Sequence, residues 1–493
     1  MTQKEHLVAV NLPADGLFLA IEQKAEDDFS RENCTRLIRA FIQRFLDTKP
    51  DVIFLNVNYR RALTPSQVMD SYLYNIDTDE NGRTVKTLSP TTEGVSKYFT
   101  TFFTCARPLL QKGIDIYEIL TRQIREAGCK VYLSVRMNDG HYRDNPAINT
   151  PFSMKHSCNG DGAALDYSQE AVQNRYYAYI EELLSTYKVD GIELDWLRYP
   201  SVLPKEKRGD HTIISDYMRR IRALLDGFDP DLGLAVRLYP HEEKNLGYGF
   251  DPVQWLCDGT ADLLTIENFY VPTNFEMPVK AWRESIAKRN TEKRPYTLLC
   301  GSDWGVCCQA GQHIPMNPSL VRGFAADCLS QGADGIYLFN FFEENDDSSW
   351  ELTEEGKLKN CFSQRLFAAR DPYGLPRRHI HIGATTNRYP ISLAPGERYC
   401  FTYERGGKGR VILGCDGDVF KLQVNGKTVS LSEETVFPGY EYPAKTKSDF
   451  VYAVTQLAPV VKTAPATGER IEITVENNTT EPANILWLEL SFS

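Results

Sequence analysis

Short apolar runs of strand length recur along the first three quarters of the chain, with amphipathic stretches of helical spacing between them. In one of these runs Val131, Leu133 and Val135 alternate with Tyr132 and Ser134, as expected for a buried strand. The eight runs cover residues 7–11, 52–58, 131–138, 191–198, 232–239, 263–270, 296–304 and 335–342. The clearest helical patterns cover residues 35–46, 116–126, 171–187, 214–225 and 320–330. Eight strands that alternate with helices predict an α/β fold, a (β/α)8 barrel of the TIM type.

The pattern changes after residue 370. Residues 371–376 are typical of a linker, and from His379 onward short alternating runs are separated by Gly, Asn, Asp and Pro. One of these turns is Asn425-Gly426, a pair that favours a tight hairpin. This texture predicts an antiparallel β-sandwich of seven or more strands. We therefore expect two domains, a catalytic barrel at residues 1–370 and a β-sandwich at residues 371–493.

Two connections after predicted strands are long. Residues 60–114 include a polar, hairpin-like segment and an aromatic run (Tyr98, Phe99, Phe102 and Phe103), and residues 138–168 are rich in Gly, Asn and Pro. Both lie on the face of the barrel where active sites are built. They are expected to shape a substrate pocket, although the aromatic run is at least as well explained by packing in the core.

Composition narrows the range of functions. With 493 residues and 42% hydrophobic side chains the chain is globular, and its net charge of -11 argues against nucleic acid as a partner. No apolar stretch approaches the roughly 20 residues that cross a bilayer, and the polar start predicts no signal peptide. The 12 cysteines lack the spacing of metal ligands. We expect a cytoplasmic enzyme with buried reduced thiols and neither metal nor cofactor.

Polar side chains gather at the carboxyl ends of the predicted strands, where barrel enzymes place their catalytic groups. Because buried charges need partners, Glu193 and Asp195 either pair with arginines in the barrel mouth or contact the substrate. The strand-end residues are Asp15 after the first strand; Arg136, Asn138, Asp139 and His141 at the third; Glu193, Asp195 and Arg198 at the fourth; then Arg237, Glu267, Asp303 and Asn340 on the last four.

The fourth strand, D-G-I-E-L-D-W, is similar to the D-G-x-D-x-D-x-E strand of chitinase-like barrels. Leu197 stands where those enzymes carry their catalytic acid. A chitinase mechanism is therefore not expected, although the motif supports a glycosidase-type barrel.

Four features together resemble the inverting exo-sialidases of glycoside hydrolase family 156. They are R-M-N-D-G-H after the third strand, Asp15 after the first, L-R-Y-P after the fourth and F-N-F-F on the eighth. The R-x-x-D-x-H spacing is the most specific of them, and the shared length and domain order extend the resemblance over most of the chain. It implies release of terminal α-linked sialic acids from glycans, in a protein that can form a homodimer.

The resemblance also implies the role of each residue. His141 would be the acid, Asp15 the base that activates water, and Arg136 and Arg198 the pair that holds the sialic acid carboxylate. Asn340 would contact the sugar, Asp139 would orient His141 or bind the glycan, and Asn138 would support them. We add Arg237 as a further contact to the carboxylate or glycerol chain, because it too ends a strand.

The chemistry is consistent with these roles. Two guanidinium groups match a carboxylate bidentately, and an imidazolium acid adds no negative charge beside it. Sialidases are known exceptions to the usual carboxylate pair of glycosidases. Because imidazole titrates near neutrality, the predicted pH profile is a bell centred on weakly acidic pH.

Two other functions compete with this one. A retaining glycosidase would use Asp195 as nucleophile and Glu267 as acid, but it leaves Arg136, Arg198 and His141 without a role. A sugar-binding barrel without catalysis would keep the arginines and would not need His141 opposite Asp15.

Overall fold

The computed structural model describes residues 6–13, 17–18, 21, 28–78, 83–89, 105–141, 143–160, 162–268, 275–303, 305–307, 313–340, 361–383, 390–417, 420–433 and 460–492. Asp15 and the aromatic run at residues 98–103 lie outside these ranges.

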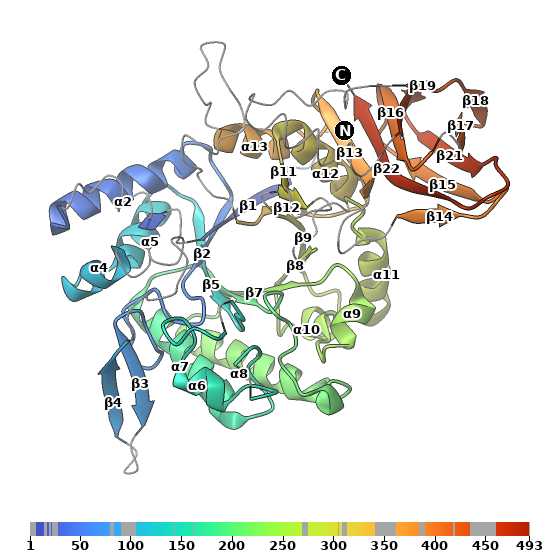
Figure 1. Cartoon of the computed structure of the whole chain (residues 1–493). Coiled ribbons are helices and arrows are strands. Elements are labelled where there is room, and N and C mark those ends of the chain that lie inside the picture. The colour runs from blue at the N-terminus through green and yellow to red at the C-terminus, as the bar shows by residue number, and fades with distance from the viewer. Residues whose placement is uncertain are drawn as a thin grey trace.

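Eight parallel strands close into a barrel, and each strand pairs with the next barrel strand along the chain (Figure 1). The barrel closes where β1 pairs with β12, with Leu7 opposite Gly335. The strands are β1 (Leu7–Leu12), β2 (Val52–Asn56), β5 (Lys130–Arg136), β6 (Gly191–Asp195), β7 (Gly233–Leu238), β8 (Leu263–Glu267), β9 (Thr297–Ser302) and β12 (Gly335–Leu338). Each corresponds to one of the eight predicted runs, so the predicted barrel is confirmed.

Helices surround the barrel, and local sequence signals fix where several of them begin. Ser30 caps α2 by accepting a hydrogen bond from the Asn33 amide, and Asn317 caps α12 in the same way. The described helices are α2 (Arg31–Leu46), α4 (Arg107–Gln111), α5 (Ile116–Glu126), α6 (Pro151–Lys155), α7 (Glu170–Thr186), η2 (Lys205–Lys207), α8 (Thr212–Phe228), α9 (Glu242–Leu246), α10 (Pro252–Cys257), α11 (Val279–Arg289), α12 (Pro318–Ser330) and α13 (Cys361–Arg370).

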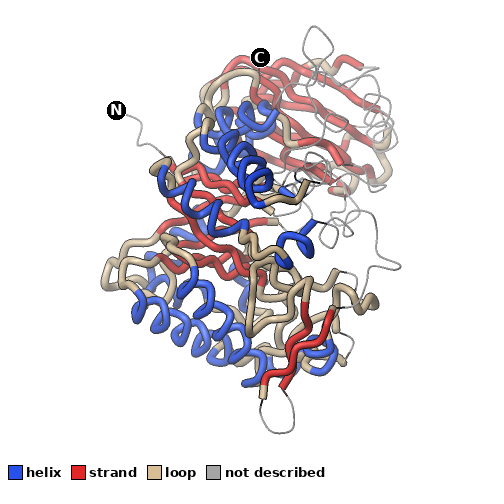
Figure 2. Tube along the Cα trace, turned by 90° about the vertical axis from the view of Figure 1, so that its left-hand side faces the viewer, coloured by secondary structure: helices blue, strands red, loops and turns tan. Residues whose placement is uncertain are grey.

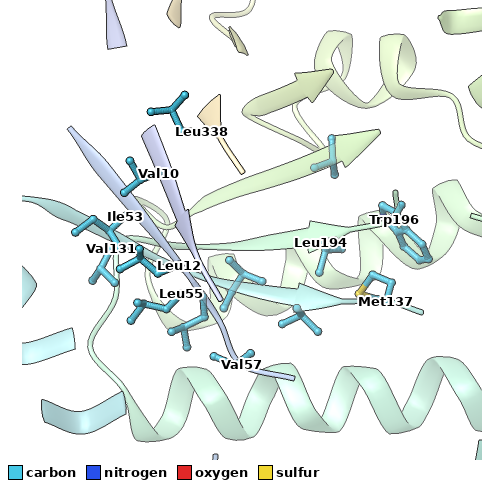
Figure 3. Close-up of a cluster of buried hydrophobic side chains, with 14 of the residues drawn as sticks. Val10, Leu12, Ile53, Leu55, Val57, Val131, Met137, Leu194, Trp196 and Leu338 are labelled. Carbon is cyan, nitrogen blue, oxygen red and sulfur yellow. The ribbon is translucent and has the colours of Figure 1, made fainter. Parts of the chain in front are cut away.

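The main core lies between the barrel strands and the helices. Every second strand residue points outward into this layer, which Figure 3 shows around the strands at one side of the barrel. Residues of this kind include Val10, Leu12, Ile53, Leu55, Val131, Leu194 and Leu338. The expected buried thiols are also found, as Cys34, Cys300, Cys328 and Cys415 are buried and form no disulfide.

Aromatic rings fill the barrel interior toward the amino-terminal ends of the strands. Phe54 packs against Tyr132 and Tyr337 with ring centroids 5.1 and 5.0 Å apart. The Tyr132 ring needs glycine beside it, because a Cβ on Gly233 would lie 2.1 Å from the tyrosine hydroxyl oxygen. The interior is therefore a packed core at this end, and only the carboxyl end of the barrel can hold a site.

The long connection after β2 carries a hairpin of β3 (Tyr74–Thr78) and β4 (Thr84–Leu88), as its polar sequence predicted. A second small antiparallel pair, β10 (Gly305–Cys307) and β11 (His313–Pro315), follows β9. Both lie in connections that follow a barrel strand, and thus on the mouth side.

The C-terminal part folds as two antiparallel sheets around a core of their own, which confirms the predicted sandwich. Asn425 and Gly426 both have positive φ, 50° and 74°, as the predicted tight turn requires. The six-stranded sheet holds β13 (Arg377–Gly383), β14 (Ile391–Leu393), β16 (Gly407–Cys415), β19 (Ser432–Glu433), β20 (Val460–Gly468) and β22 (Ala483–Phe492). The four-stranded sheet holds β15 (Arg398–Tyr403), β17 (Phe420–Val424), β18 (Lys427–Val429) and β21 (Ile471–Asn477).

The sandwich packs on the barrel beside α12, and Figure 2 shows it at the opposite end of the molecule from the β3–β4 hairpin. The contact requires glycine at residue 323, because a Cβ there would lie 1.7 Å from the Arg378 carbonyl oxygen. Along the described residues, no helix is long and apolar enough to cross a membrane.

Candidate active site at the mouth of the barrel

Arg136, Asp139 and His141 form a connected relay at the end of β5. One oxygen of the Asp139 carboxylate lies 2.6 Å from His141 Nδ1, and the other accepts a hydrogen bond of 3.0 Å from Arg136 Nη1. The His141 backbone amide also donates to Asp139 at 3.0 Å. One Asp139 oxygen thus contacts both the backbone amide and the ring of His141. Such a contact is expected of a residue that orients His141, one of the two roles that the resemblance gives Asp139.

Burial and charge make this relay asymmetric. The side chains of Arg136 and Asp139 are 2% exposed, whereas that of His141 is 21% exposed. Burial by itself raises the pKa of the Asp139 carboxyl, but His141, Arg136 and Arg198 together hold that pKa well below its usual range. Asp139 is therefore a permanent anion behind the imidazole, and His141 is the part of the relay that faces solvent.

Side chains from β2 and the connection after it hold the relay in place. Asn58 accepts a hydrogen bond from the Arg136 amide and donates one to the Arg136 carbonyl, both of 2.9 Å. Asn138 is completely buried, with its oxygen 3.1 Å from Arg60 Nη1 and its nitrogen 2.7 Å from the Tyr199 carbonyl oxygen. These contacts make Asn138 a positioning residue between β5 and the loop after β6.

Two tyrosine rings complete the walls around the relay. The Arg136 guanidinium lies over the Tyr59 ring, 4.1 Å from its centroid. The Tyr199 ring meets His141 edge-on with centroids 5.4 Å apart, and a Cβ on Gly140 would touch that ring at 3.0 Å. Tyr199 has φ of 57°, a strained left-handed backbone that persists where the surrounding structure requires it.

Arg198 and Asn340 reach the mouth from the other side. The Arg198 guanidinium is 5.4 Å from the centroid of the Phe339 ring, and it contributes to the low pKa of Asp139. Asn340 also has a left-handed backbone, with φ of 46°, and its amide donates to Asp303 at 3.1 Å. The structure thus brings Arg136, Arg198 and His141 together, while the predicted base Asp15 lies outside the described residues.

Arg237 lies deeper, inside the barrel. Its Nε and Nη2 donate to the two Glu267 oxygens at 2.8 and 3.1 Å, and its Nη1 donates to Asp195 at 2.8 Å. The guanidinium also lies 3.5 Å from the centroid of the Phe339 ring, and its side chain is wholly buried. All three guanidinium nitrogens of Arg237 are already paired, so Arg237 is not a candidate to bind the substrate carboxylate. Asp195 is likewise committed to this cluster, so of the two alternatives the pairing with an arginine is the one observed.

Glu193 lies below this cluster and is also completely buried. Its Oε1 accepts hydrogen bonds from the Ser134 hydroxyl at 2.6 Å and the Tyr337 hydroxyl at 2.9 Å. Burial, and then the nearby Asp195, raise the pKa of the Glu193 carboxyl to about 8. Glu193 is thus a neutral acid at pH 7, and its described hydrogen bonds are to hydroxyl groups and not to an arginine.

The barrel interior around Glu193 holds an unusual group of polar atoms. Among the described residues, several buried atoms there have no hydrogen-bond partner: both amide atoms of Asn11, and Asn56 Oδ1, Glu193 Oε2, Asp195 Oδ2 and Thr265 Oγ1. Groups of this kind are normally satisfied by ordered water. The space under the mouth is therefore polar.

The raised pKa of Glu193 predicts that the protein loses stability as pH rises. The unfolded chain releases this proton near pH 4.5 and the folded chain keeps it to about pH 8, so the free energy of unfolding falls by about 1.4 kcal/mol per pH unit between these values. Glu193→Gln keeps the carbonyl that Ser134 and Tyr337 contact and removes the titration. In thermal unfolding from pH 5 to pH 8, Tm of the wild type should fall more steeply than that of the variant. Parallel curves would contradict this assignment.

Sequence reasoning did not single out Asn58, Tyr59, Arg60 or Tyr199. The first three lie in N-V-N-Y-R-R, directly after the apolar part of the second strand. A polar strand end is the same signal that marked the third strand, so Asn58, Tyr59 and Arg60 could have been found from the sequence. The strained backbone of Tyr199 leaves no such mark in the sequence.

Comparisons with known proteins give structural likenesses only. No protein-family model and no curated protein matches the chain. Similar solved structures include an endo-1,4-β-mannanase from Rhizomucor miehei, with 11% identity, a TM-score of 0.44, and coverage of 76% of this chain and 96% of that one. An α-L-fucosidase isoenzyme from Paenibacillus thiaminolyticus has 12% identity, a TM-score of 0.36, and coverage of 96% and 97%. A class V chitinase from Pseudomonas fluorescens Pf-5 has 11% identity, a TM-score of 0.38, and coverage of 73% and 99%.

Proposed function

We propose that this protein is a glycoside hydrolase, an exo-sialidase that releases terminal α-linked sialic acids from glycans with inversion at the anomeric carbon. The observation that carries the proposal is the relay of Arg136, Asp139 and His141. A buried anion holds an imidazole that is 21% exposed, and the same anion binds a guanidinium at the mouth. The contact between Asp139 and His141 supports the first of the two roles that the resemblance gives Asp139, which are to orient His141 or to bind the glycan.

In the proposed reaction His141 gives its proton to the glycosidic oxygen while the bond from that oxygen to the anomeric carbon breaks. A water molecule forms the new bond to the anomeric carbon from the opposite face and loses a proton to Asp15, which the resemblance assigns as base. The products are free sialic acid of inverted configuration and the shortened glycan. The proton on Asp15 returns through solvent to His141 before the next turnover.

Arg136 and Arg198 are the proposed clamp for the sugar carboxylate. Both side chains lie at the mouth, and both are close enough to Asp139 to lower its pKa. A planar guanidinium binds a carboxylate through two parallel hydrogen bonds, which a lysine cannot reproduce. The substrate carboxylate would thus meet two cations beside the imidazole that protonates its leaving group.

The retaining alternative is not favoured by the geometry. Asp195 and Glu267 are each 1% exposed and share one guanidinium, that of Arg237. A retaining enzyme needs one carboxylate to attack and the other to donate a proton, on opposite sides of the scissile bond. Two carboxylates bound to the same buried cation do not offer that arrangement.

The wild-type protein is expected to hydrolyse a fluorogenic α-sialoside and to leave the matching β-galactoside and α-fucoside intact. Proton NMR of the first product should show the β-anomer of sialic acid, because inversion converts an α-linkage into a β-hydroxyl. Absence of turnover on the sialoside would refute the sialidase assignment. An α-anomer released first would mean retention and would remove Asp15 from the role of base.

A further inference from the structure

A cavity of about 280 Å³ lies between the β3–β4 hairpin and the start of α6. Figure 1 shows the hairpin beside α6 and α7, and Arg175 of α7 contacts the hairpin at the Ile76 carbonyl. The volume is close to the lower limit of small-molecule sites. The cavity is built by the connections after β2 and β5, which also build the mouth of the barrel.

One face of the hairpin forms a wall of this cavity. Asn75 pairs with Thr87 and Asp77 pairs with Val85, so these four side chains project from the same face of the two strands. All four line the cavity, together with Ile76 between them, Asp70, and the Pro151-Phe152 pair of α6. Residues that alternate with them, such as Thr84, project from the other face.

The wall offers hydrogen-bond donors as well as acceptors. Asn75 Oδ1 accepts a hydrogen bond of 2.7 Å from Arg61, which fixes the amide orientation and leaves the Asn75 NH2 group to donate into the cavity. The Thr87 hydroxyl adds a group that donates and accepts, and Asp77 adds a carboxylate. Pro151 supplies an apolar surface opposite, next to the Phe152 ring, which is itself covered by the Arg175 guanidinium 4.2 Å from its centroid.

This lining fits a neutral sugar. Sugar hydroxyls both donate and accept hydrogen bonds, and the C–H faces of a sugar ring pack on apolar side chains. A second sialic acid is disfavoured because Asp77 adds a negative charge to the described lining, whereas the nearby cation, Arg175, is already paired with Asp70. A metal ion is disfavoured because Arg175 already neutralises Asp70 at 3.2 Å. In addition, the described residues hold no group of three or more His, Cys, Asp or Glu side chains suited to a metal.

A buried arginine connects the cavity to the active site. Arg61, 0% exposed, binds Asn75 of the hairpin and also donates to the Ala147 and Pro146 carbonyls at 2.9 and 3.1 Å. These carbonyls belong to the connection that starts with Asp139 and His141. Arg61 therefore joins the cavity wall to the same connection that carries the relay.

We propose that this cavity binds a neutral sugar of the glycan from which the sialic acid is removed, and so selects oligosaccharide substrates over small aryl sialosides. The identity of that sugar as part of the leaving glycan rests on the proposed function. The binding of a neutral sugar does not, because it follows from the lining alone.

The test compares Thr87→Tyr, which fills the cavity, with Thr84→Tyr on the same strand and the opposite face. Lactose is titrated against each protein by saturation-transfer NMR. Kinetics are measured for sialyllactose and for an aryl sialoside. We expect Thr87→Tyr to weaken lactose binding and to lower kcat/KM for sialyllactose, each by about tenfold, or about 1.4 kcal/mol. The aryl sialoside and the Thr84→Tyr protein should behave like the wild type.

Three outcomes separate the two proposals. Lactose binding that depends on Thr87 in a protein that hydrolyses neither sialoside would support the sugar site and refute the sialidase. If the wild type hydrolyses both sialosides, two results would overturn the sugar site. One is an equal effect of Thr87→Tyr on the two substrates, and the other is no lactose binding by the wild type. If Thr87→Tyr does not fold, the lactose titration is repeated with Thr87→Val, which removes the hydroxyl group. It should bind lactose about threefold more weakly, and unchanged binding would overturn the site.

Discussion

Replacing His141 with alanine is expected to lower kcat for α-sialoside hydrolysis by about 10²- to 10⁴-fold, the usual contribution of a positioned general acid. The reason is that in the proposed mechanism His141 supplies the proton on which departure of the leaving group depends. The Asp139 carboxylate, 2.6 Å from Nδ1, fixes the position of the imidazole ring. The loss should be greater for sialyllactose than for an aryl sialoside, because a stable phenolate leaves without full protonation. The measurement is kcat for both substrates between pH 4 and pH 8, where the alkaline limb of the profile should disappear.

His156→Ala is the matched control for this experiment. His156 lies in the same long connection and its Nδ1 contacts Gln169 at 2.7 Å, outside the relay. Its removal should leave the shape of the pH profile unchanged. If His141→Ala kept a third or more of wild-type kcat on sialyllactose, His141 could not be the acid.

Replacing Arg237 with methionine should destabilise the fold by about 3–5 kcal/mol, because it leaves two buried carboxylates without their cation. Asp195 and Glu267 are each 1% exposed, so bulk solvent does not screen their charges once the guanidinium is gone. Urea unfolding at pH 7 measures the loss. The loss should shrink at pH 5, where an unpaired buried carboxylate becomes neutral by taking up a proton.

Arg222→Met is the control for burial. Arg222 also binds two aspartates, Asp226 at 2.7 Å and Asp262 at 3.1 Å, but each of these is 52% exposed. Because solvent screens such pairs, its loss should cost no more than about 1 kcal/mol. Equal losses for the two variants would show that the Arg237 cluster is not a buried ion network.

These two predictions separate arginines that look alike in the sequence. Arg136, Arg198 and Arg237 each end a barrel strand or follow it closely, and each was a candidate to bind the substrate carboxylate. Within the structure, Arg237 binds two carboxylates inside the barrel, whereas Arg136 and Arg198 lie around Asp139 at the mouth. The carboxylates that each guanidinium meets, and not its residue type, distinguish Arg237 from the other two.

Local order along the chain was enough to predict the fold and to mark the strand end that carries the relay. The alternation of strand and helix patterns depends on neighbouring residues, and so does the Asn425-Gly426 turn, which needs positive φ at both residues. The relay could also be found because Arg136, Asp139 and His141 lie within six positions at one strand end. Residues so close in sequence stay near one another in space whichever way the rest of the chain folds.

Only the tertiary structure decided which charges meet and where the cavity beside the β3–β4 hairpin opens. The contacts of Asn58 with Arg136, of Arg237 with Glu267 and of Arg61 with Ala147 join residues that are 30 to 86 positions apart. Such pairs depend on the register of the barrel strands and on how long connections fold back over the mouth. The sequence offers many carboxylates that could pair with each arginine, and only the folded geometry selects among them.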